Sequence, residues 1–138
     1  MTKIYLSGNM TPNSDAYEDW THEFSNSIKC LYGSKDYICS FSVLDNDPKF
    51  IVHHDLARLK KCDILVINLG VLHDDYHLTG SIIEIYEAYK QNKPVYAFTS
   101  ENLIRSKQAN SPWIQQFITK EFDNITELLE YLRCDEDI

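Results

Sequence analysis

No stretch of the sequence is apolar enough to span a membrane, since none approaches the roughly 18 apolar residues that a transmembrane helix needs. The opening segment, MTKIYLSGNM, is too short and too polar for the apolar core of a signal peptide. The four cysteines (Cys30, Cys39, Cys62 and Cys134) are scattered and include no C-x-x-C pair. We therefore expect a cytoplasmic protein with reduced, mostly structural thiols and no membrane partner.

Basic residues are few. The chain has 13 Lys and Arg against 21 Asp and Glu, which gives a formal net charge of −8. It contains no basic stripe that could follow a row of nucleic-acid phosphates. This composition argues against a polynucleotide partner. It still allows a single nucleotide, because one phosphate group needs only a few hydrogen-bond donors.

Common catalytic and cofactor motifs are missing as well. The sequence has no P-loop, no G-x-G-x-x-G, no G-x-S-x-G and no Cys/His nucleophile arrangement. Histidine and aspartate gather in HHD at 53–55 and in HDDYH at 73–77, but the spacing matches no standard zinc site. We therefore expect neither a metal ion nor an organic cofactor.

The sequence does have the composition and the alternating pattern of one α/β domain spanning residues 1–138. It is 43% apolar and 25% charged, as is ordinary for a globular protein. Strands are predicted at Lys3–Ser7, Asp36–Leu44, Asp63–Leu69 and Pro94–Thr99, and a short fifth strand is allowed near Glu121–Asp123. Helices are predicted at 14–32, from Asp47-Pro48 to about Cys62, and at Ser81–Asn92, Ser111–Phe122 and Asn124–Leu132.

Strands separated by helices form parallel βαβ units with right-handed crossovers. We therefore predict a flavodoxin-like three-layer sandwich with a doubly wound parallel sheet of four to five strands. Ligands of such sheets bind beyond the carboxyl ends of the central strands. The site is therefore expected among Ser7–Asn13, Leu69–Ser81 and the loop after Phe98.

The segment TGSIIE, residues 79–84, is the strongest local signal for chemistry. Gly80 is expected to permit a tight approach to the helix, and Ser81 to cap it. Glu84 is then placed in the first turn, where free N–H groups and the helix dipole favour the carboxylate. An ionised carboxylate at a pocket suits a covalent glycosyl intermediate. A capping box, with Glu84 bonded to the Ser81 N–H, explains the same pattern equally well.

Two further residues are candidates for the same site. Tyr5 lies on the first predicted strand, where its phenol could hold the rotamer of a nucleophile. Asp55 lies on the second predicted helix, in HHDL, and is a further carboxylate that could face the site. Each also has an ordinary structural interpretation, since strand tyrosines are most often core residues and helix carboxylates are most often exposed.

Four segments together resemble one enzyme family. They are KIYLSGNM, AYEDW, HHDLARLKKCDILVINL and TGSIIEIYEAYKQNKPVYAF, in that order. This series resembles the nucleoside 2-deoxyribosyltransferases and the related 2'-deoxynucleoside 5'-phosphate N-hydrolases. The resemblance covers about the first hundred residues and extends weakly to ITELLEYL. It implies a flavodoxin-like fold, a small-molecule nucleoside or nucleotide as substrate, and a homodimer or larger homo-oligomer in which a neighbouring subunit often completes the pocket.

The resemblance also implies roles for individual residues. Glu84 matches the family nucleophile, Tyr5 the tyrosine that orients it, and Asp55 the aspartate that assists at the base. The residues that match the loop lining the sugar and base pocket are Ser7, Gly8, Asn9 and Met10. Gly80 and Ser81 match the turn beside the nucleophile.

The sequence departs from the family at one informative position. Six residues before the nucleophile, the transferases commonly carry an aspartate and the hydrolases a phosphate-binding serine, whereas this chain carries Leu78. An arginine expected near the first helix of the hydrolases is also missing. We therefore favour sugar transfer between bases. Hydrolysis of a nucleoside 5'-monophosphate is the alternative, and a non-catalytic nucleotide-binding or sensing domain is the second alternative.

Overall fold

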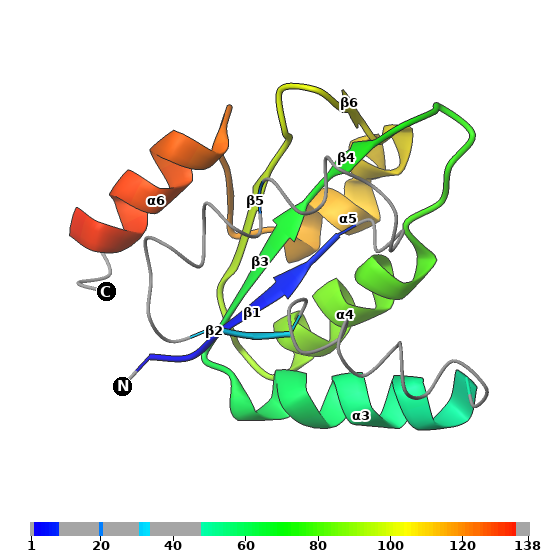
Figure 1. Ribbon diagram of the computed structural model, residues 1–138, viewed down its shortest axis with the longest axis vertical. Helices are drawn as coiled ribbons and strands as arrows, with labels where there is room; N and C mark the ends of the chain where they lie inside the picture. Colours follow the sequence, from blue (N-terminus) through cyan, green and yellow to red (C-terminus); the bar gives the residue numbers. More distant parts are fainter. Residues whose placement is uncertain (1, 9–19, 21–30, 34–47, 135–138) are drawn as a thin grey trace.

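The computed structural model describes residues 2–8, 20, 31–33 and 48–134, and within them it contains one five-stranded parallel sheet (Figure 1). The strands are β1 (Ile4–Ser7), β2 (Leu31–Gly33), β3 (Ile64–Asn68), β5 (Val95–Phe98) and β7 (Lys120–Glu121). They are arranged in the order β2-β1-β3-β5-β7, and every neighbouring pair is parallel. This is the flavodoxin-like order, so the predicted α/β class is confirmed.

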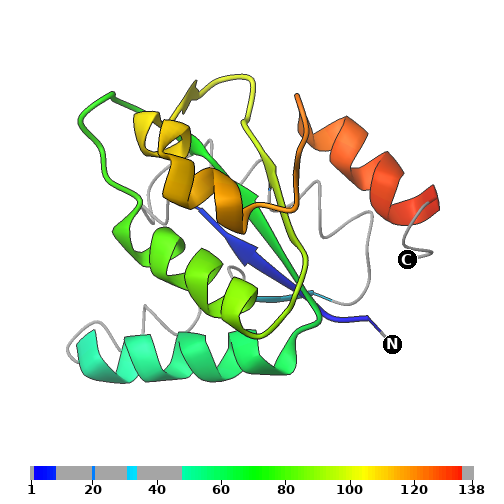
Figure 2. The same ribbon diagram turned by 180° about the vertical axis from the view of Figure 1, so that it is seen from behind.

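Helices cover both faces of the sheet. α3 (Pro48–Lys61), α4 (Thr79–Lys90) and α5 (Pro112–Phe117) lie together on one face, which is turned towards the viewer in Figure 2. α6 (Ile125–Cys134) packs on the other face, where its leucines join a core cluster with Trp20. A 3-10 turn, η1 (Lys107–Asn110), precedes α5. A two-stranded antiparallel sheet, β4 (Gly70–Val71) with β6 (Ile104–Arg105), is separate from the main sheet.

Successive side chains of β1 point to opposite faces of the sheet and so enter different helix layers. Ile4 and Leu6 belong to the cluster on the α6 side, whereas Tyr5 belongs to the cluster on the α3–α4 side. All three side chains are fully buried. β3 is buried along its whole length, as its near-continuous apolar run predicts for a central parallel strand.

The order of strands also fixes where a ligand cleft can form. After β1 the chain passes to β2 on one side of it, whereas α3 brings the chain back to β3 on the other side. Connections therefore diverge between β1 and β3, which is the topological switch point of the sheet. Ligands of doubly wound sheets bind beyond the carboxyl ends of the strands at such a point. Here those ends are Ser7 and Asn68.

Some predicted boundaries are wrong. Leu31 and Tyr32 were expected to end a helix at 14–32, but they form β2, because pairing with β1 outweighs their helical spacing. The remainder of that helix, Trp20 apart, and the predicted strand Asp36–Leu44 lie outside the described residues. The helix predicted at Ser111–Phe122 ends at Phe117, since Thr119 and Phe122 donate backbone hydrogen bonds to β5 and draw the chain into β7. β7 lies close to the short fifth strand that the sequence allows.

Two other expectations concern membranes and cysteines. None of the described helices is long and apolar enough to cross a bilayer. Cys62 and Cys134 are free thiols, the first buried and the second exposed. Burial raises the pKa of Cys62 to about 11, so its thiol stays protonated near neutral pH. Cys30 and Cys39 lie outside the described residues.

Candidate functional site

A hydrogen bond joins the end of β1 to α4 at the switch point. The Ser7 hydroxyl donates to Oε1 of Glu84 over 2.9 Å. Ser7 is fully buried, and Glu84 is partly buried in the second turn of its helix. Because Ser7 and Tyr5 are two residues apart on one strand, both side chains lie on the sheet face that α4 covers. Glu84 is therefore held against the sheet instead of extending into bulk solvent.

The Tyr5 phenol is an unpaired polar group beside this carboxyl. Its ring is fully buried, and its hydroxyl makes no hydrogen bond of normal geometry to any described residue. Burial raises the pKa of Tyr5 far above its usual value, and the charges of Glu84 and Asp55 raise it further. The phenol is therefore neutral at any physiological pH. It remains available to donate to a carboxylate, and it is close enough to Glu84 to influence the pKa of that group.

Asp55 reaches the same region from α3. Its side chain is partly exposed, but Oδ1 is buried and has no hydrogen-bond partner among the described residues. Burial raises the pKa of Asp55 to about 7, and the positive charge of Arg58 opposes this shift. The charge of Asp55 in turn raises the pKa of both Tyr5 and Glu84. The Tyr5 phenol on β1, the Asp55 carboxyl on α3 and the Glu84 carboxyl on α4 thus interact electrostatically.

Glu84 is not the stabilised carboxylate that the sequence predicts. Burial raises its pKa to about 7, although the nearby hydroxyl groups of Tyr5 and Ser7 lower it and the charge of Asp55 raises it. The expectation was wrong because α4 begins at Thr79, which places Glu84 in the second turn, away from the free N–H groups of the helix start. Near neutral pH the carboxyl group is divided between its acid and its ionised form.

Ser81 does not cap the helix either. The N-cap position is Leu78, which makes no side-chain capping bond, and Ser81 is the third helical residue. The buried Ser81 hydroxyl donates instead to the carbonyl oxygen of Gly8 over 3.3 Å. The capping-box alternative fails with it, because the Glu84 carboxyl accepts a hydrogen bond from Ser7 across the sheet–helix interface.

Beside Glu84, Gly8 makes a close approach to its neighbours and Gly80 does not. A Cβ at Gly80 meets nothing within 4 Å, so the tight approach predicted there is wrong. Gly8 has φ of 156°, and a Cβ on it would lie 3.2 Å from the Asn68 Cβ and 3.4 Å from the Trp20 ring. Ser7, Gly8 and Ser81 are therefore brought together beside Glu84. Asn9 and Met10, predicted to line the same pocket, lie outside the described residues.

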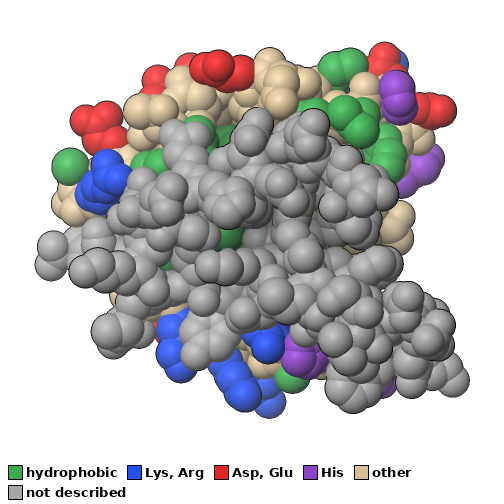
Figure 3. All heavy atoms as spheres, in the orientation of Figure 1, with side chains coloured by type: hydrophobic (Ala, Val, Ile, Leu, Met, Phe, Trp, Pro, Cys, Tyr) green, Lys and Arg blue, Asp and Glu red, His purple; other side chains and the backbone are tan. Residues whose placement is uncertain are grey.

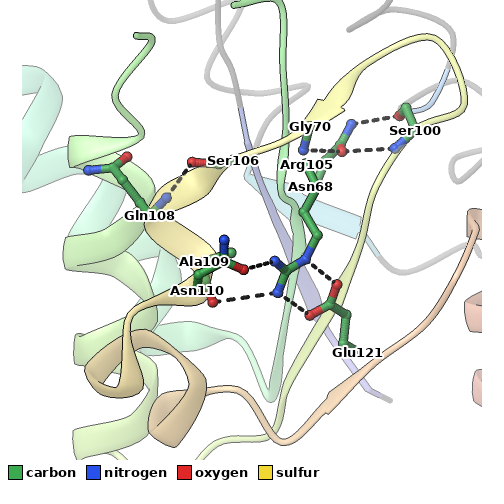
Figure 4. Close-up of polar contacts among 9 residues, drawn as sticks. All are labelled: Asn68, Gly70, Ser100, Arg105, Ser106, Gln108, Ala109, Asn110 and Glu121. Carbon is green, nitrogen blue, oxygen red and sulfur yellow. Dashed lines mark hydrogen bonds and ion pairs between the residues drawn. The ribbon is translucent and has the colours of Figure 1, made fainter. Parts of the chain in front are cut away.

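Asn68 is a site residue that the sequence analysis missed. It is 1% exposed at the carboxyl end of β3. Its Nδ2 donates to the Ser100 hydroxyl over 2.7 Å, while its Oδ1 accepts from the backbone N–H groups of Gly70 and Ser100 (Figure 4). Asn68 thus joins the start of β4 to the segment that follows β5. The available signal was that Asn68 is the one polar residue in the apolar run ILVINL, residues 64–69.

Leu78 is buried, at 4% exposed, and its N–H donates to the Gln108 side chain over 2.7 Å. Asp74 and Asp75, the carboxylates that precede Leu78 in the same loop, are both exposed, and Asp74 forms an ion pair with Lys107 at 3.4 Å. No carboxylate of this loop therefore takes the position that Leu78 occupies.

Cations near these loops are paired with carboxylates. Arg105 donates to both Glu121 carboxylate oxygens, over 2.8 and 3.0 Å, and it also bonds Asn110 (Figure 4). On the face seen in Figure 3, acidic side chains gather along the upper edge, towards which β1 and β3 point in Figure 1. Lys and Arg gather along the lower edge, where α3 lies in Figure 1, and the last turn of α3 contains Arg58, Lys60 and Lys61.

Metal ligands and a separate cavity are the two other features that bear on a site among the described residues. No three His, Cys, Asp or Glu side chains come together as metal ligands there. A cavity of about 450 Å³ lies between β7 and α6, with Lys120, Phe122 and Tyr131 in its lining. It shares no lining residue with the group around Glu84, so it takes no part in this site.

Comparison with known proteins supports the fold but names no activity. No family model matches the chain, and no curated protein matches it. A solved structure described as "Crystal structure of conserved protein from Enterococcus faecalis V583" superposes with a TM-score of 0.68 and 19% sequence identity. The alignment covers 100% of this chain and 99% of that chain. At this identity the similarity shows a shared fold and nothing about chemistry.

Proposed function

We propose that this protein cleaves the N-glycosidic bond of a nucleoside and transfers the sugar to another base, with Glu84 as the nucleophile. The observation that carries the proposal is the position of Glu84, bonded to Ser7 and beside the neutral Tyr5 phenol at the switch point of the sheet. The order of motifs that resembles the deoxyribosyltransferases supports the same chemistry. No cofactor is required for it.

In the first step, an ionised Glu84 oxygen forms a bond to C1' of the sugar. The glycosidic C–N bond breaks through an oxocarbenium-like transition state, and its electron pair stays on the base nitrogen. Asp55 in its acid form supplies the proton that the leaving base needs. The products of this step are a free base and a sugar ester of Glu84. Since Oε1 accepts from Ser7, we assign the attack to Oε2.

In the second step, a nitrogen of a second base attacks C1' and releases the Glu84 carboxylate. The proton lost by that nitrogen returns to Asp55, which restores the starting state. Two inversions at C1' give overall retention. Water could replace the second base, and the product would then be the free sugar.

The charges near the site favour an uncharged nucleoside over a 5'-monophosphate. Arg105 and Lys107, which follow β5, are both engaged by carboxylates. Leu78 also offers no hydroxyl at the position where the hydrolases commonly bind phosphate. These observations support a transferase acting on nucleosides. Hydrolysis of a nucleoside 5'-monophosphate remains the alternative, and a binding domain without catalysis is the second alternative.

Base release from thymidine and from its 5'-monophosphate, each with and without free adenine, tests the proposal. We expect deoxyadenosine to form from thymidine and adenine, and Glu84→Gln to lose nearly all of this activity. Glu87→Gln is the matched control, because Glu87 lies one turn later on the same helix in a surface pair with Lys90. Hydrolysis of the monophosphate alone would contradict the transferase assignment. Nucleoside binding without any base release would favour the non-catalytic alternative.

A further inference from the structure

Helix α3 carries a side-chain hydrogen bond directly beside Asp55. The Arg58 Nε donates to Nε2 of His54 over 2.7 Å, and both side chains are partly buried. An imidazole nitrogen that accepts a hydrogen bond carries no proton, so His54 is neutral here, with its proton on Nδ1. His54 belongs to the HHD segment at 53–55, whose spacing matches no standard zinc site. The bond to Arg58 gives this histidine a different task.

The same guanidinium group is the cation that acts on Asp55. Arg58 follows Asp55 by three residues, so the two side chains are neighbours on the surface of the helix. The charge of Arg58 lowers the pKa of Asp55, against the larger effect of burial. No ion pair joins the two, although the structure describes both side chains, and Oδ1 of Asp55 has no hydrogen-bond partner among the described residues. Arg58 therefore lies near the carboxyl group without being bound to it.

The bond to His54 explains why this pair does not close. A guanidinium group binds a carboxylate most strongly through two parallel N–H groups, and one such edge consists of Nε and a terminal nitrogen. His54 occupies Nε, so that edge is not available to Asp55. A closed pair between Arg58 and Asp55 would favour the ionised carboxylate. An ionised Asp55 has no proton to give to a leaving base.

Charged and titratable groups on the other elements favour the protonated form of Asp55. Glu84 on α4 and Tyr5 on β1 both interact with the charge of Asp55, which raises the pKa of each. Helix α3 lies beside α4 on one face of the sheet (Figure 2). An ionised Glu84 disfavours a second negative charge nearby, whereas Arg58 favours it. The protonation of Asp55 therefore depends on how closely Arg58 approaches.

We propose that His54 is a positioning residue, which holds the Arg58 guanidinium short of Asp55 so that Asp55 keeps the proton needed by the leaving base. This inference rests on the proposed function, in which Asp55 is the proton donor. The contact between His54 and Arg58 and its effect on Asp55 can nevertheless be measured without any substrate.

Carbon-13 NMR titration of the Asp55 carboxyl in the full chain tests the role of His54, and Asp55→Asn identifies the signal. His54→Leu removes the acceptor and lets Arg58 pair with Asp55, so we expect the pKa of Asp55 to fall from about 7 to about 6 or below. His54→Gln keeps an acceptor oxygen and should preserve a value near 7. His53→Leu is the matched control, because His53 is the exposed neighbouring histidine of the same helix, and it should leave the pKa of Asp55 unchanged.

A double variant separates positioning from a general structural effect. In His54→Leu combined with Arg58→Leu, the guanidinium is gone, so the pKa of Asp55 should return to about 7 or above. An unchanged pKa in His54→Leu, an equal fall in His53→Leu, or a fall that persists in the double variant overturns the proposal.

The activity profile provides the second readout. In His54→Leu the alkaline limb of base release should move to lower pH together with the pKa of Asp55, and His54→Gln should restore it. An alkaline limb that stays in place while the pKa of Asp55 falls overturns the positioning role. If the pKa falls as expected but the unaltered protein releases no base, the contact between His54 and Arg58 is confirmed and the proposed function fails.

Discussion

The Ser7 hydroxyl lies 2.9 Å from Oε1 of Glu84 and donates a hydrogen bond to it. This bond crosses from the last residue of β1 to the second turn of α4, between segments that are remote in the sequence. It opposes the effect of burial, which raises the pKa of Glu84 to about 7. The ionisation of the proposed nucleophile is therefore set by contacts across the sheet–helix interface.

Removing the Ser7 hydroxyl should make Glu84 a weaker acid. Ser7→Ala removes one donor to the carboxylate, so we expect the pKa of Glu84 to rise above about 7 and the acid limb of the activity profile to move with it. Carbon-13 NMR titration of the glutamate carboxyls measures the pKa directly. Ser106→Ala, a buried serine that caps η1, should leave the Glu84 pKa unchanged. An unshifted Glu84 pKa in Ser7→Ala would show that the bond has no electrostatic effect.

Glu84 should reduce the stability of the fold at high pH. Its folded pKa of about 7 exceeds the usual 4.5, so the folded state retains a proton that the unfolded state releases. Stability is therefore lost as pH rises from about 4.5 through about 7. Glu84→Gln should unfold at higher denaturant than the unaltered protein at pH 8, by on the order of 2–3 kcal/mol, with a much smaller difference at pH 5. A difference independent of pH would contradict the raised pKa.

The activity should be highest near neutral pH. Glu84 must be ionised to attack, so activity rises as pH increases through about 7, whereas Asp55 must be protonated to assist the base, so activity falls above about 7. The two apparent pKa values belong to the interacting pair. Asp55→Asn should lower the rate by roughly 100-fold and abolish the alkaline fall. A variant that retains the alkaline limb would assign that limb to another group.

Asn68 should contribute to stability more than its size suggests. Asn68→Ala leaves the N–H groups of Gly70 and Ser100 and the Ser100 hydroxyl without their partner, at a cost of about 2–4 kcal/mol in urea unfolding. The control is Asn124→Ala, which removes an exposed hydrogen bond to the Glu127 N–H at the start of α6 and should cost about 1 kcal/mol. Equal losses would indicate that the Asn68 network adds nothing beyond one ordinary bond.

Much of the fold followed from the sequence, because buried parallel strands leave a strong local signal. The apolar run DILVINL became β3, and alternating strands and helices were enough to predict a doubly wound sheet. β2 was misassigned because a three-residue strand has almost no local pattern, and Leu31 also fits helical spacing. Its conformation depends on pairing with β1, which no short window of sequence contains.

The site was predictable in its members but not in its electrostatics. Tyr5, Ser7, Asp55 and Glu84 were all named from the sequence. In the structure Ser7 bonds Glu84, and Tyr5 and Asp55 influence its pKa; their roles stay predictions. The ionisation of Glu84 was predicted wrongly, because α4 begins at Thr79 and not at Ser81. Glu84 therefore lies beyond the first turn, where burial raises its pKa and the helix dipole stabilises its charge less. Asn68 was missed because its partners, Gly70 in β4 and Ser100 after β5, come from two separate segments.

Intact-mass spectrometry after incubation with a 2-fluoro-2-deoxynucleoside tests the central claim most directly. The fluorine slows both steps by destabilising the oxocarbenium-like transition state, so the sugar ester should accumulate. We predict a mass increase of one fluorinated sugar, mapped by peptide sequencing to Glu84 and absent in Glu84→Gln. Release of base with no adduct, or an adduct on any other residue, would contradict Glu84 as the nucleophile.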